Sequence, residues 1–229
     1  MQSTYAVPVS ALNVDARATF IMKTYTHLLG AMLGFTLIEI FLFRSGLAAT
    51  IAEALLGVSW LFVLGGFIVV GWLASRAAHR ATSPLAQYGA LTLFVVAEAI
   101  IFVPLLYVAN IAAGGGVIQS AAIVTLIGFT GLTAIVFMTR KDFSFLGGLL
   151  KWGFIIALVL IVAGVLFGFE LGTFFSVAMI ALAGGAILYD TSNILHHYPE
   201  DRYVGASLEL FASVALLFWY VLSLFLSRD

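Results

Sequence analysis

The chain has 229 residues, of which 63% are hydrophobic and only 9% are charged. A soluble domain usually carries about 25% charged residues, and no soluble core could hide this much apolar surface. The composition therefore excludes a soluble protein and predicts a polytopic protein of the lipid bilayer. The formal net charge of −1 gives no reason to expect nucleic acid as a partner.

Seven stretches are long and apolar enough to cross a bilayer, which takes about 20 residues of helix. Their approximate bounds are 22–43, 54–75, 85–108, 118–138, 145–169, 173–194 and 203–227. Backbone polar groups inside lipid must be paired within the segment, so each stretch is predicted to be a helix. The loops are too short to separate domains. We therefore expect one all-α domain over residues 21–229, preceded by a mobile polar tail over residues 1–20.

Basic residues gather on one side of the predicted bundle, and this bias predicts its orientation. The richer side holds Arg17, Lys23, Arg76, Arg80, Arg140, Lys141 and Arg202. The other side holds only Arg44 and Arg228. We therefore expect a cytoplasmic N-terminus and an external C-terminus. Short tails without a eukaryotic targeting signal favour a bacterial inner membrane.

Two acids in the last two predicted spans are the strongest functional candidates. Asp190 lies six residues before His196, where the sixth span ends, and Glu209 lies six residues after Tyr203, where the seventh begins. A helix rises 1.5 Å per residue, so both carboxyl groups are expected about 9 Å below the same membrane surface. Charged groups inside spans are costly and usually face the interior of a bundle. We therefore expect the two acids to face each other.

Helical spacing places both acids on stripes of small and polar residues, which favour close helix contacts in membranes. Asp190 shares its stripe with Met179, Ala183 and Ala186, and Glu209 shares its own with Gly205, Ala206, Ala212, Ser213, Leu216 and Tyr220. The opposite stripe of the last span is bulky and is expected to face lipid; it holds Phe211, Val214, Leu217 and Phe218. The alternative for Asp190 is that it only caps its helix and reaches water.

Two carboxyl groups held close in a low dielectric cannot both ionise at low cost, so one keeps its proton and the pair titrates as a unit. Near neutral pH, we expect a hydrogen bond between the carboxyl group and the carboxylate to lock the pair. Loss of the shared proton would make the acids repel and separate their helices. Asp190 and Glu209, with Ser213 nearby, would also make a weak, transient site for Ca²⁺, which prefers six to eight oxygen ligands. Glu98, near the middle of the third span, is a further candidate for an ion path. The alternative for Glu98 is a hydrogen-bonded acid that locks two helices.

Several segments resemble the Bax inhibitor family, in the family's order. ALAGGAILYDTSNIL followed by ASLELFASVALLF resembles its last two helices, and FMTRKDFSFLGGLL resembles its short basic loop. FIMKTYTHLLGAMLGFTL and FVVAEAIIFVPLL resemble its first and third helices, so that the resemblance covers residues 18–226. It implies a seven-helix bundle with helix 7 near the centre. In the members for which transport is proposed, it implies a pH-sensitive calcium leak.

In those members the resemblance implies two aspartates, on helices 6 and 7, that share a proton, and an arginine on helix 2 that latches onto the first. Asp190 matches the first aspartate of the family's YDT motif. The second position holds Ser213, so this chain lacks that carboxylate, and Glu209, one turn earlier, is the nearest acid. Arg76 and Arg80 are the only candidates for the latch.

These observations predict a pH-sensitive cation leak, with Ca²⁺ favoured and H⁺ as the other ion considered, gated by the acidic pair. The alternative is a regulator without transport, whose partner is a membrane protease or another membrane protein in a stress or cell-death response. The missing helix-7 aspartate favours this alternative. A solute carrier would need internal repeats and broken helices, and the sequence shows neither. It also lacks cysteine, a phosphate loop and zinc-ligand spacing, so neither an enzyme nor a resident cofactor is expected.

Overall fold

Eight α-helices and two short 3-10 helices form the described part of the chain, residues 7–80, 83–113 and 115–227 of this computed structural model. In chain order they are η1 (Val9–Ala11), α1 (Val14–Arg44), α2 (Leu47–Leu56), α3 (Trp60–Arg80), α4 (Pro84–Ala112), α5 (Gly115–Thr139), α6 (Leu146–Phe167), α7 (Gly172–His196), η2 (Glu200–Arg202) and α8 (Tyr203–Leu226). Seven of these helices, all except α2, are long and apolar enough to cross a membrane. The predicted all-α, seven-span architecture is confirmed.

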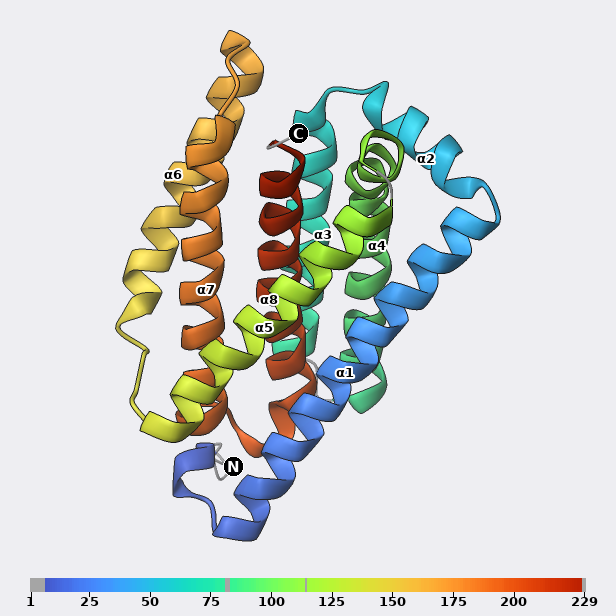
Figure 1. Cartoon of the computed structure of the whole chain (residues 1–229). Coiled ribbons are helices and arrows are strands. Elements are labelled where there is room, and N and C mark those ends of the chain that lie inside the picture. The colour runs from blue at the N-terminus through green and yellow to red at the C-terminus, as the bar shows by residue number, and fades with distance from the viewer. Residues whose placement is uncertain (1–6, 81–82, 114, 228–229) are drawn as a thin grey trace.

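The last helix, α8, occupies the centre of the bundle, where it contacts α1, α3, α4, α5 and α7 (Figure 1). Phe211, Val214 and Leu217 of its bulky stripe are only 3%, 5% and 4% exposed, and Phe218 stacks on Phe102 of α4. The prediction that this stripe faces lipid is therefore wrong, whereas the central position implied by the family resemblance is confirmed. Lipid tails are as apolar as leucine, so a bulky apolar face does not reveal whether its neighbour is lipid or protein.

The second predicted span lies further along the sequence than predicted, and the separate short helix α2 precedes it. The sequence predicted a single helix over residues 54–75, but the chain forms the ten-residue α2, turns, and then forms α3 from Trp60 to Arg80. Ten residues of helix cover only about 15 Å, which is too short to cross a bilayer. The spanning helix α3 therefore begins and ends later in the sequence than the predicted span over residues 54–75. Arg76 and Arg80 lie in the last turns of α3 and not in a loop.

The end of the bundle at the bottom of Figure 1 holds the start of α1, the end of α3, the α5–α6 loop and the α7–α8 connection. We call it the N-side, and we call the opposite end, which holds α2 and the end of α8, the C-side. The seven basic residues of the predicted cytoplasmic side lie at or near the N-side. Arg228 lies outside the described residues.

Part of the predicted tail belongs to the N-side of the bundle. Helix α1 begins at Val14 rather than at residue 22, and Asn13 caps it by accepting a hydrogen bond from the backbone N of Ala16. Val9 is fully buried, and its backbone N donates to the carbonyl O of Tyr198 over 2.9 Å. Residues 1–6 lie outside the described residues, and the mobility of the tail stays a prediction.

Close packing of α8 against α3 depends on Gly205. A Cβ atom at this position would lie 3.3 Å from the carbonyl O of Ala78 and 3.3 Å from Nε2 of His79. The missing side chain lets the end of α3 lie directly on the first turn of α8. This contact fixes which side of α3 faces the central helix.

We expect Gly205→Leu to lower the thermal unfolding midpoint of the detergent-solubilised protein, because overpacking a close contact costs about 1–3 kcal/mol. Gly30→Ala is the control, since a Cβ at Gly30 would meet nothing within 4 Å. That control should gain up to about 1 kcal/mol from the higher helix propensity of alanine. Equal midpoints for Gly205→Leu and Gly30→Ala would contradict the close α3–α8 contact.

Candidate functional site

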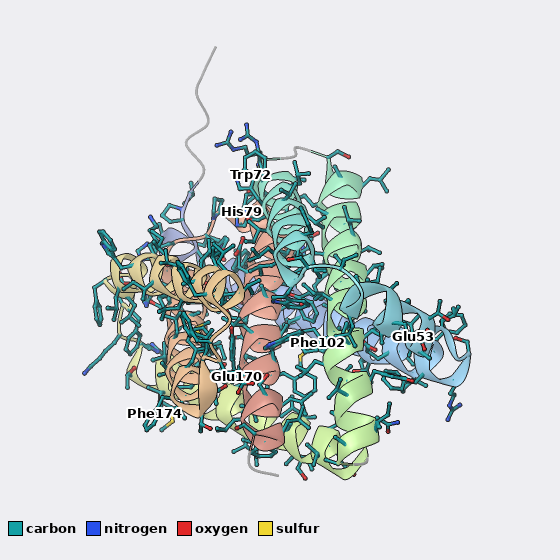
Figure 2. The ribbon with its side chains drawn as sticks, turned by 90° about the horizontal axis from the view of Figure 1, so that it is seen from above. Glu53, Trp72, His79, Phe102, Glu170 and Phe174 are labelled. Carbon is teal, nitrogen blue, oxygen red and sulfur yellow. The ribbon has the colours of Figure 1, made fainter. Side chains whose placement is uncertain are left out.

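A cavity of about 840 Å³ lies between α3, α4, α6, α7 and α8. Its wall on α8 runs from Glu209 to Tyr220, which is about 17 Å of helix. Most of the lining side chains are apolar or aromatic, and the charged ones are Glu98, Lys151, Glu170, Asp190 and Glu209. Figure 2, which looks down from the C-side, shows Glu170 between α7 and α8. The cavity thus brings four acids and one base together from five segments of the chain.

Asp190 faces the interior of the bundle from α7. The residue is 9% exposed, and Oγ of Ser213 on α8 donates a hydrogen bond of 2.5 Å to Oδ2 of Asp190. Met179, Ala183 and Ala186, which share its stripe, are also buried, as helical spacing predicted. The alternative in which Asp190 only caps α7 and reaches water is therefore wrong.

Glu209 is half-buried on α8, one turn before Ser213, and it turns toward α3. Oγ of Ser75 donates to Oε1 of Glu209 over 2.6 Å, and Nδ1 of His79 lies 3.7 Å from the same oxygen. Ser75 and His79 are four residues apart on α3, so both side chains lie on one face of that helix. Glu209 is thus held by α3, while Asp190 is held by α8.

The two acids line one cavity from adjacent helices, and each lies six residues from the N-side end of its helix, as predicted. They are not bonded directly. In the part of the chain that the structure describes, each carboxyl group has its own serine donor, and the predicted hydrogen bond between the two carboxyl groups is absent. The described residues also contain no group of three His, Cys, Asp or Glu side chains that could hold a metal ion.

Glu98 lines the same cavity from α4 and is buried, and its place in an ion path stays a prediction. The latch candidates do not reach the cavity. The guanidinium of Arg76 lies over the ring of Trp72 at 5.1 Å, and among the described residues neither Arg76 nor Arg80 forms an ion pair. Sequence reasoning missed Ser75 and His79, which contact Glu209 from α3. Helical spacing could have found them had the helix been extended to Arg80.

A second, smaller cavity of about 480 Å³ lies at the N-side, and we call it the N-side vestibule. It is lined by His79, Ser144, Tyr189, Asn193, His197, Tyr198 and Pro199. Tyr189 lines both cavities, and Nε2 of His79 lies 3.4 Å from the hydroxyl O of Tyr198. His79 therefore touches the vestibule with one ring nitrogen and approaches Glu209 of the large cavity with the other.

Asp142 fastens the α5–α6 loop to the end of α7. Its Oδ1 accepts hydrogen bonds from the backbone N of Ser144 at 2.8 Å and from Oγ of Ser192 at 3.3 Å. Its Oδ2 lies 3.0 Å from Nε2 of His197. These contacts, first of all the backbone bond from Ser144, lower the pKa of Asp142 from 3.8 to about 2.

A depressed pKa in the folded protein stabilises the fold above the unfolded pKa and loses this effect as the pH falls through the folded pKa. We therefore expect the stability difference between the native protein and Asp142→Asn to be constant near about pH 5 and to vanish between 3.8 and about 2. The Asp142 side chain is 47% exposed, so solvent screening keeps the difference small. Thermal unfolding in detergent at a series of pH values measures it. A difference that persists at full size at pH 2 would contradict the assigned role of Asp142.

The fold and the cavity together define a polytopic helical membrane protein with acids buried beside its central helix. The family model described as "Inhibitor of apoptosis-promoting Bax1" matches residues 17–229. The chain therefore belongs to the Bax inhibitor family, as its sequence segments had suggested.

Relatives of the chain include bacterial proteins and a mouse protein. Over 118 residues, the chain is 39% identical to "Modulator of FtsH protease YccA" of Escherichia coli K12 and to "Inner membrane protein YccA" of strain CFT073. These matches cover 50% of this chain and 53% of each relative, so the chain spans about half the length of these bacterial relatives. The chain is 28% identical to mouse "Protein lifeguard 4" over 225 residues, which is 95% of this chain and 89% of that protein. None of these three names describes an enzyme.

Proposed function

We propose that the protein is a pH-sensitive cation leak, with Ca²⁺ or H⁺ as the ion, and that Asp190 and Glu209 control passage. The observation that carries this proposal is the sign of the charge in the large cavity, where four acids face a single lysine. Apolar walls with a low dielectric focus the field of such charges and raise the local concentration of cations. The central helix supplies one of these acids, and its neighbours supply the others.

In this proposal the N-side faces the cytoplasm, because the basic residues gather there. A cation that enters from the C-side passes Glu170 and Glu98 before it meets Asp190 and Glu209. Its site there has few oxygen ligands and binds weakly, which a leak requires because the ion must also depart. The contacts of Glu209 with Ser75 and His79 separate this site from the N-side vestibule.

Charge on the acids provides the pH dependence of the proposed leak. When both carboxyl groups are ionised they repel, and their repulsion weakens the contacts between α7, α8 and α3. When one of them is protonated, the serine hydrogen bonds hold the helices together and the way to the vestibule stays closed. Flux is therefore expected to rise as the pH is raised.

Calcium flux into proteoliposomes over a range of pH tests the proposal. We expect the native protein to show flux that rises several-fold with pH, and we expect Asp190→Asn and Glu209→Gln to flatten this dependence because each removes one titrating charge. Glu53→Gln is the matched control, because Glu53 is an exposed acid on α2 that lies far from the cavity (Figure 2). Native protein with no more flux than protein-free liposomes would overturn the leak.

The second candidate function is regulation of a membrane-bound protease. It is favoured by the 39% identity over 118 residues to a protein named as a modulator of the FtsH protease. In this function the N-side of the bundle would contact the protease, and the acids would set the shape of the contact surface.

Affinity purification after cross-linking in native membranes tests the second candidate. If the protein is a regulator, a membrane protease is expected to copurify with it at a constant ratio. The amount of copurified protease should be the same for Glu53→Gln. The absence of any membrane protease from the purified complex, together with measurable calcium flux, would reject regulation in favour of the leak.

A further inference from the structure

We propose that His79 is the proton-exchange group of this site: it carries protons between the N-side vestibule and Glu209, and so lets the pH at the N-side set the charge of Glu209. This inference deepens the proposed function, because it names the route by which the pH acts on the leak.

The position of His79 between the two cavities is the first support. Its side chain is 34% exposed and lines the vestibule, while Glu209 lines only the large cavity. Nδ1 lies 2.8 Å from the carbonyl O of Ser75 and 3.7 Å from Oε1 of Glu209. Nε2 lies 3.4 Å from the hydroxyl O of Tyr198. One imidazole ring thus spans the boundary between the vestibule and the acid.

The surroundings of the ring hold it in this position. Its centroid lies 5.8 Å from that of Tyr198, with a tilt of 31° between the rings. Tyr198 in turn packs against the buried apolar cluster that contains Val9, Phe20 and Val204. Gly205 leaves the space that the ring occupies, since a Cβ there would lie 3.3 Å from Nε2. Aromatic packing and a glycine on the opposing helix therefore fix the imidazole between the vestibule and Glu209.

Histidine suits this exchange, while arginine would not. Imidazole gains and loses its proton between about pH 5 and 8, whereas a guanidinium stays charged throughout. The predicted arginine latch could only hold a carboxylate in place. A histidine in contact with Glu209 can also change the charge of the carboxylate.

The proton transfer balances without any further reactant. A proton from the vestibule binds Nε2 and converts the neutral ring, protonated at Nδ1, into an imidazolium ion. The Nδ1–H then leaves the carbonyl O of Ser75, which lies 2.8 Å away, and closes the 3.7 Å gap to Oε1 of Glu209, so that its proton passes to the carboxylate. This step leaves a neutral ring with its proton on Nε2 and an uncharged carboxylic acid. The reverse sequence returns the proton to the vestibule.

Other titratable groups surround the pair from each neighbouring element. They are Asp190 and Tyr189 of α7, His197 and Tyr198 of the α7–α8 connection, Glu98 of α4, Lys151 of α6, and Arg76 and Arg80 of α3 itself. Among the described residues, none of these groups forms an ion pair with Glu209, whereas His79 lies 3.7 Å from its Oε1. Asp190 shares the large cavity with Glu209, so it responds to the charge of Glu209 without a direct bond.

The experiment follows the protonation of Glu209 by time-resolved infrared spectroscopy after a pH jump at the N-side of proteoliposomes. The carboxylic acid band that is missing in Glu209→Gln reports this group. We expect His79→Ala to slow the appearance of this band at least about tenfold, and we expect free imidazole in the buffer to restore the rate, because it replaces the lost proton carrier. His27→Ala is the matched control, since His27 is a half-buried histidine of α1 that lines neither cavity.

Rescue by imidazole separates proton transfer from a merely structural role, because a distorted site would not recover its rate. An unchanged rate in His79→Ala, or a slow rate that imidazole fails to restore, would overturn the inference. If imidazole restores the band rate in His79→Ala but proteoliposomes of the native protein show no calcium flux, the proposed leak is rejected and the proton route stands. If the native protein shows calcium flux but the band rate is unchanged in His79→Ala, the leak stands and the proton route through His79 is rejected.

Discussion

A carboxyl group buried among apolar helices needs a hydrogen-bond donor, because burial without one is costly. Asp190 of α7 accepts a hydrogen bond from Ser213 of α8, and Glu209 of α8 accepts one from Ser75 of α3. These two bonds connect three helices at one depth of the bundle. The charge of either acid therefore acts on the contacts between helices, and the proposed response to pH depends on this connection.

The central position of α8 explains how a helix of mostly apolar residues carries this chemistry. Five helices surround it, so its acid and its serine are reached from several sides, while α6 packs mainly on α7 at the edge of the bundle. The large cavity thus lies between the central helix and a peripheral one. Asp190 and Glu98 of this cavity are buried in protein, which lowers the cost of placing charge inside a span.

The leak and the protease regulator would use the same part of the molecule. His79 and Tyr198 connect the acids to the α7–α8 connection, and the backbone of Val9 is bonded to Tyr198. The α5–α6 loop is fastened to the same end of α7 by Asp142. Glu209 therefore lies close to the vestibule and to the surface that a partner at the N-side would contact. A change in its charge would act on both.

The sequence by itself determined the number of spans, the equal depth of Asp190 and Glu209, and the interior-facing side of α7. These follow from the length of apolar runs, the rise of a helix and the spacing of small residues, which are local properties. Only the tertiary structure decided that the bulky side of α8 meets protein, and that Ser75 and His79 contact Glu209 in place of the neighbouring arginines. The rotation of α3 about its axis depends on its close contact with α8 at Gly205, which is a tertiary contact. The sequence of an apolar helix face does not show whether lipid or another helix covers it.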